Sequence, residues 1–384
     1  MPWALILAAI VGSFAATSSG TTRAPFIIVM AQDLSTSVVM VANIVSMTAT
    51  AWGITSLITG WLSDRVGRRP FIVGGPAVLA LCMIGVARAD GFLEVALWST
   101  ASGACSGTFM GTVFAEISIR APASHRGRAL SWVMSGQSLT LVVGVPLAAF
   151  LGAYIGWRGW HLCVAAMAVL GALSLWWTTR TPAGQKVLPR GAPPKGRKLT
   201  GAVIALLTMS VAERICYGLV VVYYATFLQQ EYRQPLAAVA IPLLLMALGN
   251  IVGTLVGGPI ADRTRDRLGV FGASLLATGA VGILLFAWMP SVAVSVGVGF
   301  AYAFINAIGR PALMAALSDV PEDVRGTVMG LNGAAASVGW VGAAALGGWM
   351  LGTVGFAGFG PLSAALAAIG AGLAFWQRAV GKRA

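Results

Sequence analysis

The stretch from Gly60 to Arg69 reads GWLSDRVGRR and follows a predominantly apolar run over residues 38–59. Its glycines permit a tight turn and its arginines favour water, so it fits a short connection between two membrane-crossing helices. The pattern returns at Gly258 to Arg267, which reads GPIADRTRDR. The first glycine, first aspartate and first arginine of the two copies are each 198 residues apart. This recurrence predicts an internal repeat.

Other landmarks keep this offset to within one residue. Gln32 and Asp33 match Gln230 and Glu231 at 198 residues, and Pro122, Arg126 and Gly127 match Pro321, Arg325 and Gly326 at 199. The sequence therefore predicts two parallel repeats that pack about an axis normal to the membrane, with a site between them.

The composition places the repeats in a bilayer. Of 384 residues, 58% are hydrophobic and 10% are charged, and a helix needs roughly 20 apolar residues to cross the hydrocarbon. Apolar runs predict twelve spans, at 3–23, 38–61, 70–87, 92–116, 128–154, 159–178, 200–228, 236–260, 268–289, 292–317, 325–352 and 358–377. We predict an all-α membrane protein of two pseudo-symmetric six-helix bundles, 1–179 and 200–384. A basic, proline-rich linker at 180–199 joins them.

The placement of charge predicts the topology. Lys and Arg number 25 against 12 Asp and Glu, and 19 of the basic residues fall on one side of the predicted spans against four on the other. Basic loops stay in the cytoplasm, so both termini are expected inside a cell (inner) membrane. The excess positive charge serves topology, and no nucleic-acid partner is expected. Four cysteines and two histidines form no cluster with metal-ligand spacing.

The string GWLSDRVGRR resembles the signature between helices 2 and 3 of the major facilitator superfamily, and Gly258 to Arg267 resembles its weaker second copy. The resemblance covers the whole chain and implies alternating access rather than an enzyme. It also implies a cytoplasmic gate, whose candidate residues are Gly60, Asp64, Arg65, Gly67, Arg68, Arg69, Asp262 and Arg263. The second copy has Asp266 where the first has Arg68, which predicts a looser gate there.

The stretch from Gly136 through Gly144, Pro146 and Gly152 resembles the helix 5 motif of drug and metabolite exporters. The resemblance implies a monomer that exports a small organic compound in exchange for protons. No Gly-x-x-x-x-Gly-Lys nucleotide motif is present, so we expect no cofactor and an ion gradient as the energy source. Two alternatives stay open: a carrier of organic anions or anionic lipid, and a receptor or assembly factor that does not transport.

Glu213 is the acid deepest within a predicted span, 15 residues after Lys198 and 18 before Glu231. At ~1.5 Å per residue it lies roughly 20 Å or more from either charged end and cannot reach water by extending its side chain. Such a residue is functional by default. We therefore predict that Glu213 couples transport to protons, with Arg310 as the partner to test first.

Further candidates follow from the same reasoning. Glu116 is the second proton-coupling candidate, although its place near a helix end favours an ion pair with Arg65 or Arg69. The substrate-cavity candidates are Arg214, Arg310, Arg23, Tyr217, Tyr224, Tyr302 and Asn306. Packing within the bundle is the alternative for the tyrosines, and anchoring at the membrane surface is the alternative for Arg23.

Overall fold

The computed structural model describes residues 1–122, 125–180, 201–320 and 322–381, without the side chains of Asp64 and of residues 322–327. The predicted linker at 180–199 therefore lies almost wholly outside the described residues. Two compact units result, Met1–Pro189 with Pro235–Ala240, and Arg190–Gln234 with Ile241–Ala384. The predicted bundle boundaries stay a prediction.

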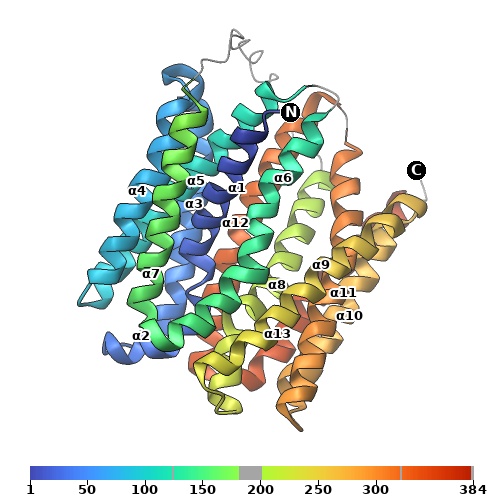
Figure 1. Cartoon of the computed structure of the whole chain (residues 1–384). Coiled ribbons are helices and arrows are strands. Elements are labelled where there is room, and N and C mark those ends of the chain that lie inside the picture. Colours follow the sequence, from blue (N-terminus) through green and yellow to red (C-terminus); the bar gives the residue numbers. More distant parts are fainter. Residues whose placement is uncertain (123–124, 181–200, 321, 382–384) are drawn as a thin grey trace. The chain divides into compact units, whose positions relative to one another are not determined.

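The described residues of the first unit form seven α-helices, coloured blue to green in Figure 1. They are α1 (Trp3–Thr21), α2 (Ile27–Asp33), α3 (Val38–Val66), α4 (Arg69–Arg88), α5 (Phe92–Arg120), α6 (Arg126–Leu139) and α7 (Val145–Thr178). A 3-10 turn, η1 (Ala24–Phe26), precedes α2, and a π-helical turn, η3 (Thr140–Gly144), joins α6 to α7.

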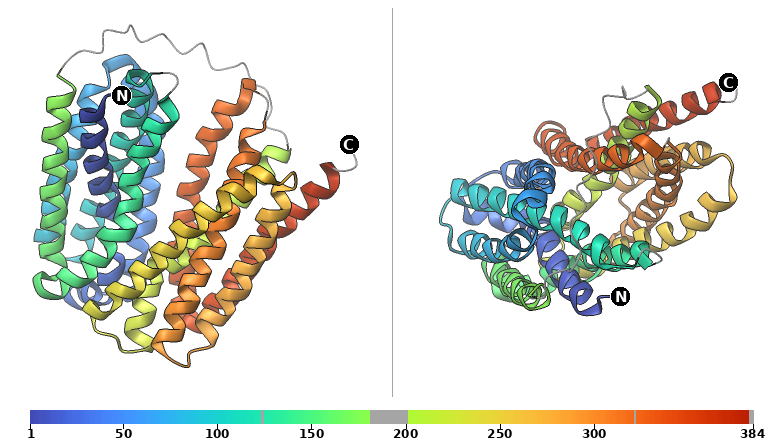
Figure 2. Two further views of the ribbon diagram at one scale, coloured as in Figure 1. Left: turned by 45° about the vertical axis from the view of Figure 1, so that its right-hand side comes forward. Right: turned by 90° about the horizontal axis from the view of Figure 1, so that it is seen from above.

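The described residues of the later half of the chain form six α-helices. They are α8 (Gly201–Glu231), α9 (Ala240–Arg263), α10 (Arg267–Ala287), α11 (Val292–Ser318), α12 (Glu322–Thr353) and α13 (Phe359–Gly381). Two 3-10 turns, η4 (Leu236–Val239) and η5 (Phe356–Gly358), precede α9 and α13. Within this unit α8 packs on α12, α13 and α11, while α10 packs on α13 and α11, as both views of Figure 2 show for α10 and α11.

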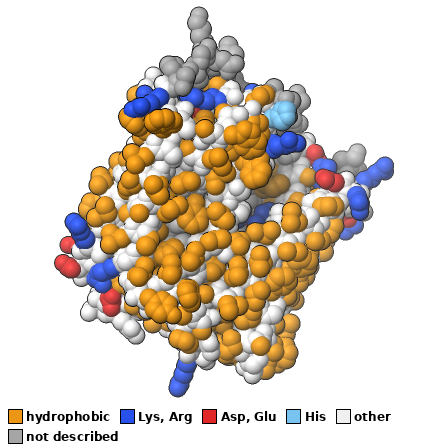
Figure 3. Space-filling view, in the orientation of Figure 1, with side chains coloured by type: hydrophobic (Ala, Val, Ile, Leu, Met, Phe, Trp, Pro, Cys, Tyr) orange, Lys and Arg blue, Asp and Glu red, His pale blue; other side chains and the backbone are white. Residues whose placement is uncertain are grey.

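Ten segments of the described chain are long and apolar enough to cross a membrane. One of them, Arg126–Thr178, has 53 residues, about 80 Å of helix, and it turns at Gly156, where φ is +70°. It therefore crosses twice, and the 29-residue α5 adds one more crossing. The prediction of twelve spans agrees with these elements. Hydrophobic side chains cover the sides of the helices in Figure 3, as contact with lipid requires.

The two units achieve the same close helix crossing with glycines on different helices. In the first unit a Cβ added at Gly107 of α5 would lie 2.3 Å from the carbonyl oxygen of Trp52 on α3. In the second unit a Cβ at Gly253 of α9 would lie 2.2 Å from the carbonyl oxygen of Phe304 on α11. Because α9 supplies the glycine, α11 is free to carry large polar side chains where α5 has glycine.

Candidate functional site

The Gly60–Arg69 segment is mostly helix rather than loop. α3 continues to Val66, so Gly60, Asp64 and Arg65 occupy its last two turns, and the turn itself is made at Gly67, where φ is +97°. Of the two glycines, Gly67 and not Gly60 therefore provides the expected turn, because only Gly67 has a backbone conformation that side chains disfavour. The Asp64 side chain lies outside the described residues, so its role as a latch stays a prediction.

Glu116 pairs with different arginines from those predicted. Arg120 donates to Glu116 Oε1 at 2.6 Å one helical turn away, and Arg68 Nη1 approaches Glu116 Oε2 to 3.9 Å. Arg65, one of the two predicted partners, instead lies over the Trp61 ring, 3.9 Å from its centroid. Glu116 is thus held by cations at the end of α5, which disfavours its role as the main proton-coupling residue.

In the second gate copy, Asp262 and Arg263 are exposed in the last turn of α9. Asp266, which differs from Arg68 at the matching place in the first copy, has a structural role. It accepts a hydrogen bond from the Gly269 amide at the start of α10, and Arg378 of α13 contacts its carboxylate at 2.5 Å. An aspartate at this position stabilises the helix start, which an arginine does not do.

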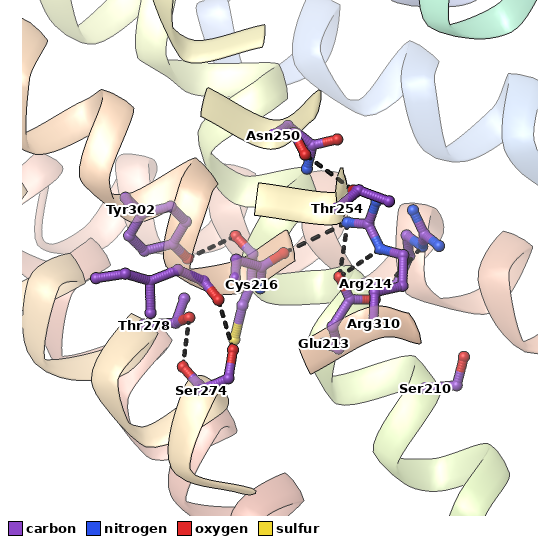
Figure 4. Close-up of polar contacts among 12 residues, drawn as sticks. Ser210, Glu213, Arg214, Cys216, Asn250, Thr254, Ser274, Thr278, Tyr302 and Arg310 are labelled. Atoms are coloured by element: carbon purple, nitrogen blue, oxygen red, sulfur yellow. Dashed lines mark hydrogen bonds and ion pairs between the residues drawn. The ribbon is translucent and has the colours of Figure 1, made fainter. Parts of the chain in front are cut away.

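A buried ion pair joins α8 to α11 (Figure 4). Arg310 donates to Glu213 Oε1 twice, from Nη2 at 2.8 Å and from Nε at 3.2 Å. The Glu213 side chain is 2% exposed and that of Arg310 is 19% exposed. Arg310 Nη2 also lies 3.4 Å from Asn306 Oδ1, one turn earlier on α11. The structure therefore brings together Glu213, Arg310 and Asn306, three of the residues selected from the sequence.

Arg214 lies on the other side of the same carboxylate. Its Nε is 3.9 Å from Glu213 Oε2, too far for a hydrogen bond. The aliphatic part of the Arg214 side chain packs against α12 at Gly339, where an added Cβ would lie 2.5 Å from Arg214 Cβ. Within the described residues the Arg214 guanidinium donates no hydrogen bond, and the side chain remains 20% exposed. Arg214 is therefore a cation with unused donors at membrane depth.

Aromatic rings flank the cluster. The guanidinium carbon of Arg310 lies 5.0 Å from the centroid of the Tyr217 ring. The Tyr217 ring in turn meets Trp340 of α12 edge to face, with centroids 6.3 Å apart. Trp340, which directly follows Gly339 in the chain, was not selected from the sequence. Only the packing of α8 against α12 places it beside Tyr217.

Tyr224 and Tyr302 do not contact the ion pair. The Tyr224 hydroxyl donates to the carbonyl of Ser295 at 3.0 Å, and the Tyr302 hydroxyl donates to the carbonyl of Cys216 at 2.8 Å. Both rings are fully buried. These contacts support the packing alternative for both tyrosines.

Arg23 is 0% exposed inside the first unit. It donates to Ser99 Oγ at 2.9 Å and to the carbonyl oxygen of Ser19 at 3.2 Å, while its Nε and Nη1 have no partner in the described part of the chain. It neither anchors at the surface nor lines accessible space here.

The sequence profile described as Major Facilitator Superfamily matches residues 8–344 and again 206–383 of this chain. The chain belongs to the major facilitator superfamily. The two overlapping matches agree with the internal repeat, and membership makes the protein a secondary transporter rather than an enzyme.

Within this superfamily, the chain is 26% identical to the uncharacterized MFS-type transporter YwfA of Bacillus subtilis, over 96% of this chain and 90% of that protein. It is 25% identical to the purine ribonucleoside efflux pump NepI of Salmonella paratyphi A, over 72% of this chain and 70% of that protein. A solved bacterial homologue of the human lysosomal transporter Spinster shares the fold, with a TM-score of 0.77 at 16% identity. The match covers 97% of this chain and 92% of that one.

Proposed function

We propose that this protein exports a small organic compound in exchange for protons and that Glu213 is the residue that binds the proton. The observation that carries the proposal is the buried Glu213–Arg310 pair at 2.8 Å, which joins two helices at membrane depth. Export is supported by the similarity to an efflux pump. The proposal includes action as a monomer in a cell membrane. It also places both termini inside the cell, which the distribution of basic residues supports.

The ion pair gives a physical route from protonation to conformation. While Glu213 is ionised, it holds Arg310 through two charge-assisted hydrogen bonds. Protonation removes the charge that attracts Arg310, because a neutral carboxyl binds a guanidinium far less strongly. The link between α8 and α11 then weakens, and the balance between transporter states shifts. A substrate that needs the ionised carboxylate is released by the same event, which is what exchange requires.

The proposal is tested by proton release. A thermal-shift screen of the purified protein against a metabolite and drug library, repeated at two pH values, identifies a ligand. Addition of that ligand to weakly buffered protein in detergent is expected to release protons from the wild type and none from Glu213→Gln. Equal release from both proteins places the coupling residue elsewhere.

A second candidate is a carrier of organic anions, including anionic lipid. The cluster contains two arginines, Arg214 and Arg310, against one glutamate, and this excess of positive charge is the specific observation in its favour. An anion binds better when Glu213 is protonated, so this carrier takes up protons on binding its substrate. The sign of proton movement in the same experiment separates the two candidates.

A further inference from the structure

We infer that the substrate is held at the Glu213 cluster by an uncharged amide-type edge, an N–H donor beside a C=O acceptor. The inference rests on the exchange function proposed above and adds to it the chemical group that is recognised. It follows from which atoms of the cluster are occupied and which are free (Figure 4).

Glu213 has one engaged oxygen and one free oxygen. Oε1 accepts both hydrogen bonds from Arg310, whereas Oε2 accepts none within the described residues. The nearest cation to Oε2 is Arg214 Nε, at 3.9 Å. Exchange requires the substrate and the proton to compete for the ionised carboxylate, and Oε2 is the oxygen available to both. The substrate must therefore present a hydrogen-bond donor to Oε2.

The donor nearest to Oε2 has the opposite need. Arg214 Nε lies 3.9 Å from Oε2 and is a buried donor without a hydrogen-bond partner in the described part of the chain. A buried donor left unpaired costs free energy, so a ligand that supplies an acceptor here is favoured. The recognised group therefore offers a donor and an acceptor side by side, as the N–H and C=O of an amide or lactam do.

The charges of the cluster exclude an ammonium group and a carboxylate as the recognised group. With Glu213 ionised the cluster has one negative and two positive side chains, so an ammonium group meets net repulsion and leaves the free donors unpaired. A carboxylate satisfies those donors but has no hydrogen for Oε2, and it binds better after Glu213 is protonated, the opposite of exchange. Only a neutral group with both functions meets both requirements.

The walls of the cluster favour a flat group. Tyr217 lies against Arg310 and meets Trp340 edge to face. Tyr217 is 3% exposed and Arg310 lies over its ring, so the partly exposed Trp340 is the ring available for contact with a planar ligand. A conjugated amide attached to an aromatic ring fits this environment.

Four probes that share one ring test the inference: benzamide, benzoate, benzylamine and methyl benzoate. Thermal stabilisation of the purified wild type is measured with each probe. Benzamide is expected to bind best, with each other probe at least about tenfold weaker. Benzamide is expected to release protons from the wild type. Glu213→Gln is expected to retain benzamide binding through its side-chain carbonyl but to release no protons.

Variants of Arg214 locate the acceptor contact. Arg214→Met removes the guanidinium and is expected to abolish the preference of benzamide over benzylamine, whereas Arg214→Lys keeps a donor and part of the preference. Tyr224→Phe, which loses a hydroxyl on the same helix away from the cluster, is the matched control and is expected to bind like the wild type.

The outcomes distinguish a failure of the amide assignment from a failure of the proposed proton exchange. Tightest binding of benzoate with proton uptake overturns the amide group and supports the organic-anion carrier. Stabilisation by none of the four probes also overturns the amide group, while the proton role of Glu213 is tested independently with the ligand from the screen. Proton release that survives in Glu213→Gln overturns the exchange function, and with it the assignment of the substrate donor to Oε2.

Discussion

Replacement of Glu213 and Arg310, singly and together, tests whether the two side chains act as one unit. Glu213→Gln leaves two arginines without their counter-charge, and breaking a buried pair in this way costs about 3 kcal/mol at the lower end of the usual range. The lower end applies because each arginine keeps about a fifth of its side chain exposed. Arg310→Gln is milder, about 2 kcal/mol, because Glu213 retains Arg214 at 3.9 Å.

The double variant removes both charges of the pair and is expected to lose about 3 kcal/mol, the same as Glu213→Gln alone. The coupling free energy is then about 2 kcal/mol, within the range for residues that share hydrogen bonds. Unfolding by SDS in mixed micelles, followed by circular dichroism, provides the four stabilities. A control cycle of Arg310→Gln with Tyr224→Phe should be additive within about 0.5 kcal/mol, since these residues share no contact.

Additivity in the Glu213 and Arg310 cycle, with a loss of about 5 kcal/mol in the double variant, would refute the reasoning. That result would mean that each side chain has an independent partner, and the link between α8 and α11 would not depend on the charge of Glu213.

Four other substitutions, and one control substitution, address the gate, the packing and the second acid. Asp64→Asn should leave the fold intact and slow transport in proteoliposomes more than it weakens substrate binding; wild-type rates would count against a latch. Asp262→Asn should slow transport less than Asp64→Asn does, because the second copy of the motif has Asp266 where the first has Arg68. Equal transport rates in the two variants would contradict this ranking. Gly107→Ala should lower the free energy of unfolding by about 1–3 kcal/mol, because the new Cβ meets a carbonyl 2.3 Å away. Gly74→Ala, with nothing within 4 Å, is the control. Glu116→Gln should leave ligand-induced proton release unchanged, and loss of release would make that acid a coupling residue.

The helices and the repeat were predictable from the sequence because lipid imposes local rules. Every backbone polar group in hydrocarbon must be bonded within its own helix, so a crossing appears as an apolar run of fixed length. The family resemblance followed from one string, Gly60 to Arg69, and its copy. The end of α3 at Val66 was harder to place, since a charged helix end and a loop have the same composition.

The depth of Glu213 was also predictable, because distance along a helix is proportional to residue number. Arg310 was likewise named from the sequence as the partner to test first, but only the structure shows the contact: Arg214, adjacent in sequence, is 3.9 Å from Glu213, whereas Arg310, 97 residues later, is at 2.8 Å. Glu116 is a case where a local signal was missed: Arg120 lies four residues later on the same helix, a spacing that predicts an ion pair, whereas the approach of Arg68 depends on the tertiary structure.

Sequence by itself therefore determined the approximate positions and the repeat of the membrane-crossing helices, and which of them carries a deep acid. Tertiary structure alone decided which side chains meet. The close approach of α9 to α11 rests on Gly253, and this leaves α11 free to carry Asn306 and Arg310. The contact of Arg214 with α12 likewise rests on Gly339. The physical reason is that helix rotation and spacing are set by interlocking of whole surfaces, which depends on residues far apart in the chain.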